Sequence, residues 1–284
     1  MKVTILEPKG YCSGVSNALR IALKAKQEHP TENVYVLGML VHNQVVINLL
    51  NEKGIITLNG NHYEEINYIP NKSVVVFTAH GHEIELDKIA NDKQLIVYDA
   101  ICPKVKNNLT LIMNETNHND VIFIGIKNHP ESNAALSLGK NIFLYDIHSD
   151  FNYSNIKSLS PLVVNQTTLN ILEIQKIYKE ILKNIPGAHI QDEICNTTRI
   201  RQTSLINLDN TVDGIIIIGD KLSSNTNRLF EISRSAHPNI ESIMINDVKE
   251  LDESFYKNKK HIAISSGAST SEVTLNAILE KLSI

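Results

Sequence analysis

The chain has 284 residues, of which 42% are hydrophobic and 20% are charged, so it can bury a large core and is expected to fold as a globular protein. Its net charge of −4, without a basic patch interleaved with aromatic residues, argues against nucleic acid as a partner. No apolar run approaches the roughly 18 residues of a membrane span, so we expect no membrane partner either.

The first predicted element is a short strand, "KVTIL" at residues 2–6. Neither a signal peptide nor an Arg-rich transit segment precedes it, so we expect a cytoplasmic protein of the bacterial type. The strand leads into "EPKGYCSGV", in which Cys12 lies between Gly10 and Gly14, and a helical pattern of apolar residues follows from Val15. The chain holds three cysteines, an odd number without an export signal, which argues against a disulfide framework.

The other two cysteines, Cys102 and Cys195, follow in matching contexts at intervals of 90 and 93 residues. Each comes after a strand-like segment, "LIVYDAIC" or "AHIQDEIC", and before a helical pattern. Ser13, Pro103 and Asn196 are the expected helix start signals. The cysteines therefore divide the chain into three nearly equal parts, which indicates an internal repeat.

Within each part the same order of strands recurs. The first ends in glycine ("VYVLG", "VIFIG", "GIIIIG"), and a later one ends in polar residues ("VVVFTAHGH", "PLVVNQTT", "HIAISSGAST"). Apolar strands that alternate with helices predict parallel sheets covered on both faces. We therefore predict an α/β fold, one unit of three pseudo-threefold-related lobes with mostly parallel sheets around a central cavity. The lobes span approximately residues 12–97, 98–192 and 193–284, and residues 1–11 close the ring with the third lobe.

Two polar segments between these elements, residues 59–71 and 148–160, are expected to be surface loops. The acidic residues that precede the cysteines, Glu7, Asp99 and Asp192, are expected to form local hydrogen bonds.

The three thiols are predicted to meet, because ligands bind at the carboxyl ends of parallel strands and the lobes surround one centre. Each cysteine precedes a helix N-terminus, whose partial positive charge favours the thiolate. Three convergent thiolates form a soft-metal site. A structural zinc would need a fourth ligand and closely spaced pairs, and neither is evident. A [4Fe–4S] cluster on three cysteines would leave one iron open to act as a Lewis acid toward a substrate hydroxyl.

Other strand-end groups indicate a small diphosphate as substrate. His42, His80 and His129 follow strands, and "LSSN" and "GAS" are expected to open helices, whose free N–H groups receive anions. The repeat pairs His80 and Thr167 with Ser266. No Walker loop or Rossmann glycine fingerprint is present, so nucleotide binding is not indicated. The remaining histidines are expected to be structural: His62, His82, His118, His148, His189, His237 and His261.

One carboxylate, Glu131, follows His129 and Pro130 at the start of a predicted helix. Taken alone, it would be an ordinary first-turn residue that complements the helix dipole. In a cavity that faces a metal-bound hydroxyl, the same group is a candidate proton donor.

These motifs together resemble the 4-hydroxy-3-methylbut-2-enyl diphosphate reductase family. The match includes "GYCSGV", "LGMLVHN", "DAICPKV", "HPES", "QTT", "EICNTTRIRQ", "SSNTNRL" and "GAST", in order from residue 10 to about residue 270. The resemblance implies a trilobal fold around a [4Fe–4S] cluster with one open iron. It implies reduction of (E)-4-hydroxy-3-methylbut-2-enyl diphosphate to isopentenyl and dimethylallyl diphosphates, the last step of the methylerythritol phosphate pathway. A ferredoxin or flavodoxin would donate the electrons.

The resemblance also implies a role for each site residue. Cys12, Cys102 and Cys195 would hold the cluster. The diphosphate would be surrounded by His42, His80, Ser223, Ser224, Asn225 and Ser269. His129 and Thr167 would line the substrate pocket, and Glu131 would donate a proton, through the substrate or through Thr167. Where the repeat favours Ser266 and the family favours Ser269, we adopt Ser269.

The chain departs from the family's usual residues at four positions: Asn17 for Arg, Ile101 for Thr, Lys104 for Leu and Asn128 for Gly. These departures concern the packing near Cys102 and the surface offered to the electron donor. Two alternatives stay open from the sequence. One is another trilobal three-cysteine iron–sulfur enzyme, such as a quinolinate synthase-like lyase, and the other is a non-catalytic module with a structural Cys₃ zinc. Neither explains the histidine, serine and asparagine residues at the strand ends.

Overall fold

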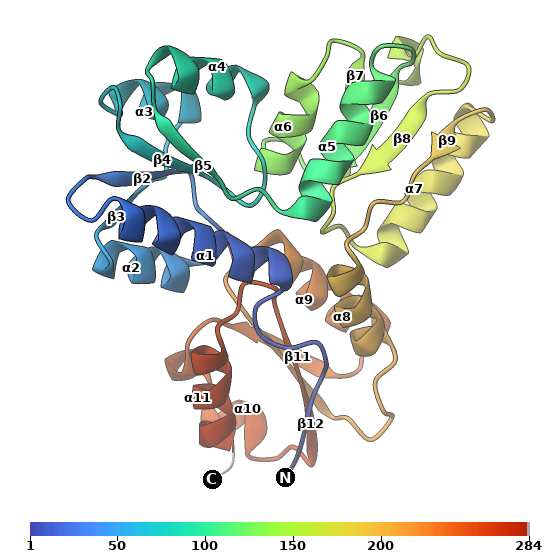
Figure 1. Ribbon diagram of the computed structural model, residues 1–284. Coiled ribbons are helices and arrows are strands. Elements are labelled where there is room, and N and C mark those ends of the chain that lie inside the picture. The colour runs from blue at the N-terminus through green and yellow to red at the C-terminus, as the bar shows by residue number, and fades with distance from the viewer. Residues whose placement is uncertain (283–284) are drawn as a thin grey trace.

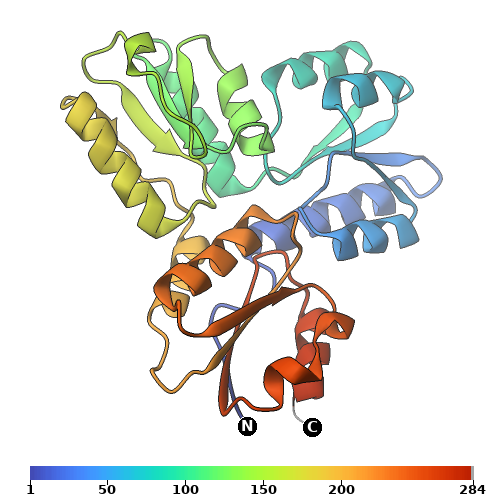
Figure 2. The same cartoon turned by 180° about the vertical axis from the view of Figure 1, so that it is seen from behind.

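The computed structural model describes residues 1–282, and within them the chain forms three separate four-stranded sheets. Figures 1 and 2 show these sheets, each with its helices, as three lobes arranged around a common centre. The strand orders are β3-β2-β4-β5, β7-β6-β8-β9 and β11-β10-β12-β1, so the three lobes share one topology. All the strand pairings are parallel. The predicted trilobal α/β fold class is confirmed.

The elements of each lobe follow in chain order. The first lobe contains α1 (Ser13–Glu28), β2 (Val34–Leu37), α2 (Gln44–Glu52), β3 (Ile55–Leu58), α3 (His62–Tyr68), β4 (Val74–Phe77), α4 (Ile84–Asp92) and β5 (Ile96–Asp99). The second contains α5 (Pro103–Glu115), β6 (Val121–Gly125), α6 (Pro130–Ser137), β7 (Ile142–Asp146), the 3₁₀ turn η1 (Tyr153–Asn155), β8 (Leu162–Asn165), α7 (Ile171–Asn184) and β9 (His189–Ile190). The third contains α8 (Asn196–Ile206), β10 (Gly214–Ile218), α9 (Ser224–Ala236), β11 (Glu241–Ile245), η2 (Val248–Glu250), α10 (Glu253–Tyr256), β12 (His261–Ser266) and α11 (Glu272–Leu282), together with β1 (Lys2–Ile5).

The central strands are apolar throughout because both faces of each sheet are covered by helices. Strand β4 illustrates this: Val74 and Val76 belong to the cluster with α1 and α2, whereas Val75 and Phe77 belong to the cluster with α3 and α4. Each fully buried side chain of this kind stabilises the fold by roughly 1.5–3 kcal/mol. The other two lobes likewise have two apolar clusters each. The cores thus lie within the lobes and leave the centre of the molecule to polar groups.

The chain passes from one lobe to the next at each cysteine. Strand β1 pairs with β12 in the third lobe, with Lys2 opposite His261 and Ile5 opposite Ile264. The following helix, α1, packs instead on β4 and β5 of the first lobe. In the same way β5 precedes α5 of the second lobe, and β9 precedes α8 of the third. Figure 1 shows the N-terminal strand beside β12, so the ring of lobes is closed by the first residues of the chain.

Two local expectations need comment. Residues 59–71 are not simply a loop, because they contain helix α3, which begins after Asn61. Asn61 Oδ1 accepts hydrogen bonds from the N–H groups of Tyr63 and Glu64, and Ile66 is the buried residue of the helix. A helix of seven residues with one buried side chain has too little apolar periodicity to be recognised in the sequence. Residues 148–160 contain only the 3₁₀ turn η1. None of the helices within residues 1–282 combines the length and the hydropathy that crossing a membrane requires.

Candidate active site

The three cysteines are free, and all of them line one cavity at the centre of the molecule. Their positions are fixed by equivalent backbone hydrogen bonds in the three lobes. The N–H groups of Cys12, Cys102 and Cys195 donate to the carbonyl oxygens of Ala268 (3.0 Å), Ala79 (3.0 Å) and Thr167 (2.9 Å), respectively. Each acceptor lies just beyond the end of a central strand. The repeat in the sequence therefore has a direct structural counterpart.

Each cysteine is itself the N-cap of the helix that follows it. The expectation that Ser13 and Asn196 are the start signals is therefore wrong, because these residues are the first of their helices. The thiol of Cys12 takes the place of a capping hydroxyl and accepts a hydrogen bond from the N–H of Val15 at 3.4 Å. Pro103 occupies the first turn of α5, as expected.

The hydrogen bonds of the cysteines also correct the pairing of Ser266 with His80. Ala79, Thr167 and Ala268 are equivalent, so the counterpart of His80 in the third lobe is Ser269. Ser269 lines the cavity. The side chain of Ser266 instead accepts hydrogen bonds from the N–H of Gly10 and from Arg201, both at 3.1 Å.

The "GAS" segment does not open a helix. Helix α11 begins at Glu272, and residues 267–270 form a turn closed by a hydrogen bond from the N–H of Thr270 to the carbonyl of Gly267. Ser271 Oγ accepts a hydrogen bond from the N–H of Thr274 at 3.1 Å and so provides the start of the helix. The "SSN" segment does open a helix, because Ser223 caps α9 and accepts from the N–H of Thr226.

The thiol groups at the centre of the molecule are suitable ligands for a soft metal or a cluster of such metals. Cys102 and Cys12 both lie close to Gly14, where an added Cβ would be 2.8 Å and 3.7 Å from their respective Sγ atoms. Burial raises the pKa of the Cys102 thiol, although the N–H groups of Lys104 and Val105 favour the thiolate. The helix N-terminus alone therefore does not keep this thiol ionised, and a bound metal would be needed to do so.

Among the described residues, no group of three or more His, Cys, Asp or Glu side chains is arranged to hold a metal ion. Ligands of an iron–sulfur cluster bind separate iron atoms, so they need not be as close together as the ligands of one ion. The three thiols around one cavity fit such a cluster in chemistry and in placement.

Replacing Gly14 with alanine tests this arrangement. The new Cβ would be 2.8 Å from Sγ of Cys102, which is closer than real Cβ contacts, so the thiol must move. We expect the affinity for iron to fall by roughly 10–100-fold, the loss typical when the support of a metal ligand is disturbed. Iron and acid-labile sulfide per chain, measured after anaerobic reconstitution at limiting iron, check this. Ser16→Ala, an exposed position on the same helix, is the control, and equal iron contents in the two variants would contradict the assignment.

Three imidazoles form one wall of the cavity. The ring centroid of His42 lies 4.2 Å from that of His80 and 5.5 Å from that of His129. Burial lowers the pKa of all three, to about 3 for His129, so the rings are neutral at pH 7. Nδ1 of His80 and Oγ of Ser269 are buried, and neither has a hydrogen-bond partner among residues 1–282. Such unpartnered groups are expected where a polar ligand completes the site.

Glu131 is 2% exposed and lies in the first turn of α6, two residues after the N-cap His129. Its carboxylate accepts two hydrogen bonds from Thr167, one from the backbone N–H to Oε1 (2.9 Å) and one from Oγ1 to Oε2 (3.0 Å). Burial raises the pKa of Glu131 to about 7, against these hydrogen bonds and the charge of Lys104. The group is therefore partly protonated near neutral pH, which suits proton donation.

The cavity brings together all the residues that the sequence singled out as the site. They are Cys12, His42, His80, Cys102, His129, Glu131, Thr167, Cys195, Ser223, Ser224, Asn225 and Ser269. Sequence reasoning missed four polar residues in the same lining: Lys104, Thr168, Thr197 and Thr198. Thr168 is the equivalent of His80 in the second lobe and could have been found by aligning the repeat on the acceptors of the cysteine N–H groups.

The residues expected to have local roles have them. Glu7, Asp99 and Asp192 each accept a hydrogen bond from the backbone N–H two residues later. Several of the histidines set aside as structural also have such partners. His261 is hydrogen-bonded to Thr4 and Thr211, and His237 is hydrogen-bonded to the carbonyl of Leu205. His82 pairs with Asp87, and His62 pairs with Glu83.

The chain is similar to known proteins over nearly its whole length. A model of the family described as LytB protein matches residues 3–283 of the chain. A protein of Bacillus subtilis (strain 168) named 4-hydroxy-3-methylbut-2-enyl diphosphate reductase is 35% identical over 274 residues, which cover 95% of this chain and 87% of its own. A protein of Malacoplasma penetrans (strain HF-2) with the same name is 32% identical over 289 residues and covers 98% of this chain and 96% of its own.

Two solved structures resemble the whole chain. The E-1-hydroxy-2-methyl-but-2-enyl-4-diphosphate reductase of Plasmodium falciparum superposes with a TM-score of 0.90 at 27% identity, covering 100% of this chain and 88% of that one. A structure described as (E)-4-hydroxy-3-methyl-but-2-enyl diphosphate reductase, the terminal enzyme of the non-mevalonate pathway, has a TM-score of 0.70 at 29% identity and covers 100% and 99% of the two chains.

Proposed function

The chain belongs to the LytB protein family, and on that basis we propose that it reduces (E)-4-hydroxy-3-methylbut-2-enyl diphosphate to isopentenyl diphosphate and dimethylallyl diphosphate. It is an oxidoreductase of isoprene biosynthesis, and its reaction is the last step of the methylerythritol phosphate pathway. The reaction consumes two electrons and two protons and releases the hydroxyl group as water. The observation that carries the proposal is that thiols, imidazoles, hydroxyls and one buried acid from all three lobes line a single cavity. Neither the lyase nor the zinc module is favoured by the comparisons.

The family implies an iron–sulfur cluster. We assign it as a [4Fe–4S] cluster held by Cys12, Cys102 and Cys195, which leaves one iron without a protein ligand. When bound, the cluster supplies the electrons of the reduction and a Lewis-acidic iron. The soft donor set and the equivalent backbone bonds that hold the three cysteines support this assignment.

The diphosphate is proposed to bind between the imidazole wall and the opposite lobe. His42, His80, Ser223, Ser224, Asn225 and Ser269 would surround it, with His129 beside the hydrocarbon part. The free N–H groups at the start of α9 face an anion favourably, and the unpartnered atoms of His80 and Ser269 gain partners. An incoming diphosphate also raises the pKa of the buried imidazoles, so binding favours proton uptake by this wall.

Glu131 is proposed as the proton donor and Thr167 as its relay. In the deprotonated state Thr167 Oγ1 donates to Glu131 Oε2. When Glu131 is protonated, its O–H donates across the same contact, and the Thr167 hydroxyl is then free to donate into the cavity. The proton would pass in this way to the departing hydroxyl group, and Glu131 regains a proton from solvent before the next turnover.

Three further proposals complete this function. The three lobes, approximately residues 12–97, 98–192 and 193–284, work as one catalytic unit. The electron donor is a ferredoxin or a flavodoxin. The enzyme works in the cytoplasm.

The proposal is tested on protein purified without oxygen. Iron and acid-labile sulfide are measured first, and turnover of the hydroxylated diphosphate with a chemical reductant follows. Inorganic diphosphate is expected to compete with the substrate, whereas a dicarboxylate such as succinate is not. Zinc without sulfide, or competition by dicarboxylates alone, would overturn the proposal.

A further inference from the structure

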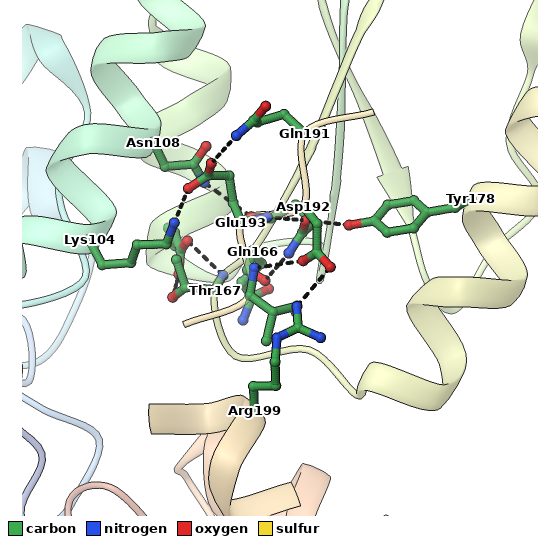
Figure 3. A network of polar contacts seen from close by, with 12 residues as sticks. Lys104, Asn108, Gln166, Thr167, Tyr178, Gln191, Asp192, Glu193 and Arg199 are labelled. Carbon is green, nitrogen blue, oxygen red and sulfur yellow. Dashed lines mark hydrogen bonds and ion pairs between the residues drawn. The ribbon is translucent and has the colours of Figure 1, made fainter. Parts of the chain in front are cut away.

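A partly buried ion pair includes one residue of the cavity lining, Lys104. Nζ of Lys104 is paired with Oε2 of Glu193, and Figure 3 shows the two side chains pointing toward each other. Lys104 lies in the first turn of α5, just after Cys102, and Glu193 lies just before Cys195. The side chain of Glu193 is only 9% exposed, against 35% for Lys104.

Glu193 is held rigidly on the second lobe. Its N–H donates to Oδ1 of Asn165 at 2.9 Å, and Oε1 accepts from Nε2 of Gln191 at 3.2 Å. Oδ1 of Asn165 also accepts from the hydroxyl of Tyr178 at 2.6 Å. Figure 3 shows these groups converging between α5 and the segment after β9. Because Glu193 cannot move freely, it fixes the position of the cation on Lys104.

The same network reaches the acid. Asn108, one turn after Lys104 on α5, donates from Nδ2 to the carbonyl of Asn165 at 3.0 Å. Two residues after Asn165, Thr167 donates to the Glu131 carboxylate from its backbone N–H (2.9 Å) and from Oγ1 (3.0 Å). Lys104 and Glu131 line the same cavity, and the positive charge of Lys104 lowers the pKa of Glu131. Because Glu131 is buried, solvent screens this interaction weakly.

We propose that Lys104 and Glu193 are positioning residues for Glu131. Lys104 supplies the positive charge that acts on the buried acid. Glu193 holds that charge in place and partly offsets its effect on Glu131. This inference rests on the proposed role of Glu131 as the proton donor. The pair would set the pH above which the acid loses its proton.

The other titratable groups around the cavity do not act on Glu131 in the way that this pair is proposed to act. The other titratable groups in the lining of the cavity are His129 at the start of the same helix, His42 and His80 on the first lobe, and the thiols of Cys12, Cys102 and Cys195. Burial lowers the pKa of the imidazoles, and any proton that they take up with the diphosphate is common to all the variants below. The charge on the cysteines and on the cluster they would hold is the same in every variant below, so it cancels in the comparison.

The test uses Lys104→Met, Glu193→Gln and the double variant in the cluster-loaded protein. Without Lys104 the carboxylate loses a favourable charge, so we expect the upper pH midpoint of kcat to rise by about one unit. Without Glu193 the cation is no longer balanced, so the midpoint should fall. The double variant should return close to the wild type. A purely structural role would lower kcat or stability without moving the midpoint in opposite directions.

A second measurement does not depend on turnover. The carboxylic-acid band of Glu131, identified by its absence in Glu131→Gln, is titrated by infrared spectroscopy, and its midpoint should shift in the same opposite directions. Lys106→Met removes an exposed lysine of the same helix, which pairs with Asp99, and should shift nothing. Midpoints that stay fixed, or that move the same way in both single variants, would overturn the inference. If turnover is absent altogether, the proposed function fails while the infrared titration still decides the role of the pair.

Discussion

Glu131→Gln is expected to lower turnover by roughly 10²–10⁴-fold, the contribution typical of a positioned general acid. Glutamine has nearly the same shape, and its Oε1 can still accept from the N–H of Thr167, but it carries no proton to donate. Iron, sulfide and the binding of inorganic diphosphate should therefore stay at wild-type levels. Anaerobic single-turnover assays, with the cluster content measured on the same samples, check this expectation.

The pH dependence of the wild type provides a second check on Glu131. A proton donor works in its protonated form, and burial raises the pKa of Glu131 to about 7. Turnover should therefore fall as the pH rises through about 7. Below that pH Glu131 stays protonated, so it should cause no loss of turnover there. Glu173→Gln, at another first-turn carboxylate on α7, is the matched control and should leave turnover unchanged. Near-normal activity in Glu131→Gln would remove the residue from its proposed role.

The fold was predictable because short segments of the sequence indicate its strands and helices, and the same order of segments occurs three times. Strands such as "VVVF" and "GIIII" are buried on both faces, and this leaves an apolar run that sequence reading detects without an alignment. The equal spacing of Cys12, Cys102 and Cys195 reflects the passage of the chain between lobes of one topology. The strand-end position of the polar residues then placed most of the site at one edge of each sheet.

What could not be predicted depends on side-chain direction and on distant partners. Ser266 and Ser269 lie three residues apart after the same apolar run, and only the turn after β12 decides that Ser269 reaches the cavity. The pairing of Lys104 with Glu193 joins residues 89 positions apart, and neither local context indicates it. The burial of Arg201 could not be predicted for the same reason, because its partners Gly10 and Ser266 lie far from it in the sequence.

Arg201→Met is expected to reduce the free energy of unfolding by roughly 2–4 kcal/mol, because the side chain is 1% exposed and satisfies buried carbonyl groups. Nη2 donates to the carbonyl of Gly10 at 2.7 Å, and Nη1 donates to the carbonyl and the hydroxyl of Ser266. Removing the guanidinium takes this donor away from the buried carbonyls of Gly10 and Ser266, at a cost of about 1–3 kcal/mol for each, whereas the Ser266 hydroxyl keeps the N–H of Gly10. It also removes one of the links between the segment before Cys12 and the end of β12. The expected result is a fall in Tm of roughly 5–10 °C, measured by calorimetry on anaerobic protein.

Arg199→Met is the matched control for this prediction, since it lies two residues earlier on the same helix. Its guanidinium pairs with Asp192 at 2.7 Å, but the two side chains are 39% and 31% exposed. A solvent-exposed pair contributes at most about 1 kcal/mol, so Tm should change little. Equal falls in Tm in the two variants would show that a disturbance of helix α8, and not the removal of the buried guanidinium, causes the loss of stability. Arg201→Lys separates charge from geometry, because a single ammonium group cannot reach Gly10 and Ser266 in the same way as a planar guanidinium, and it should restore only part of the loss.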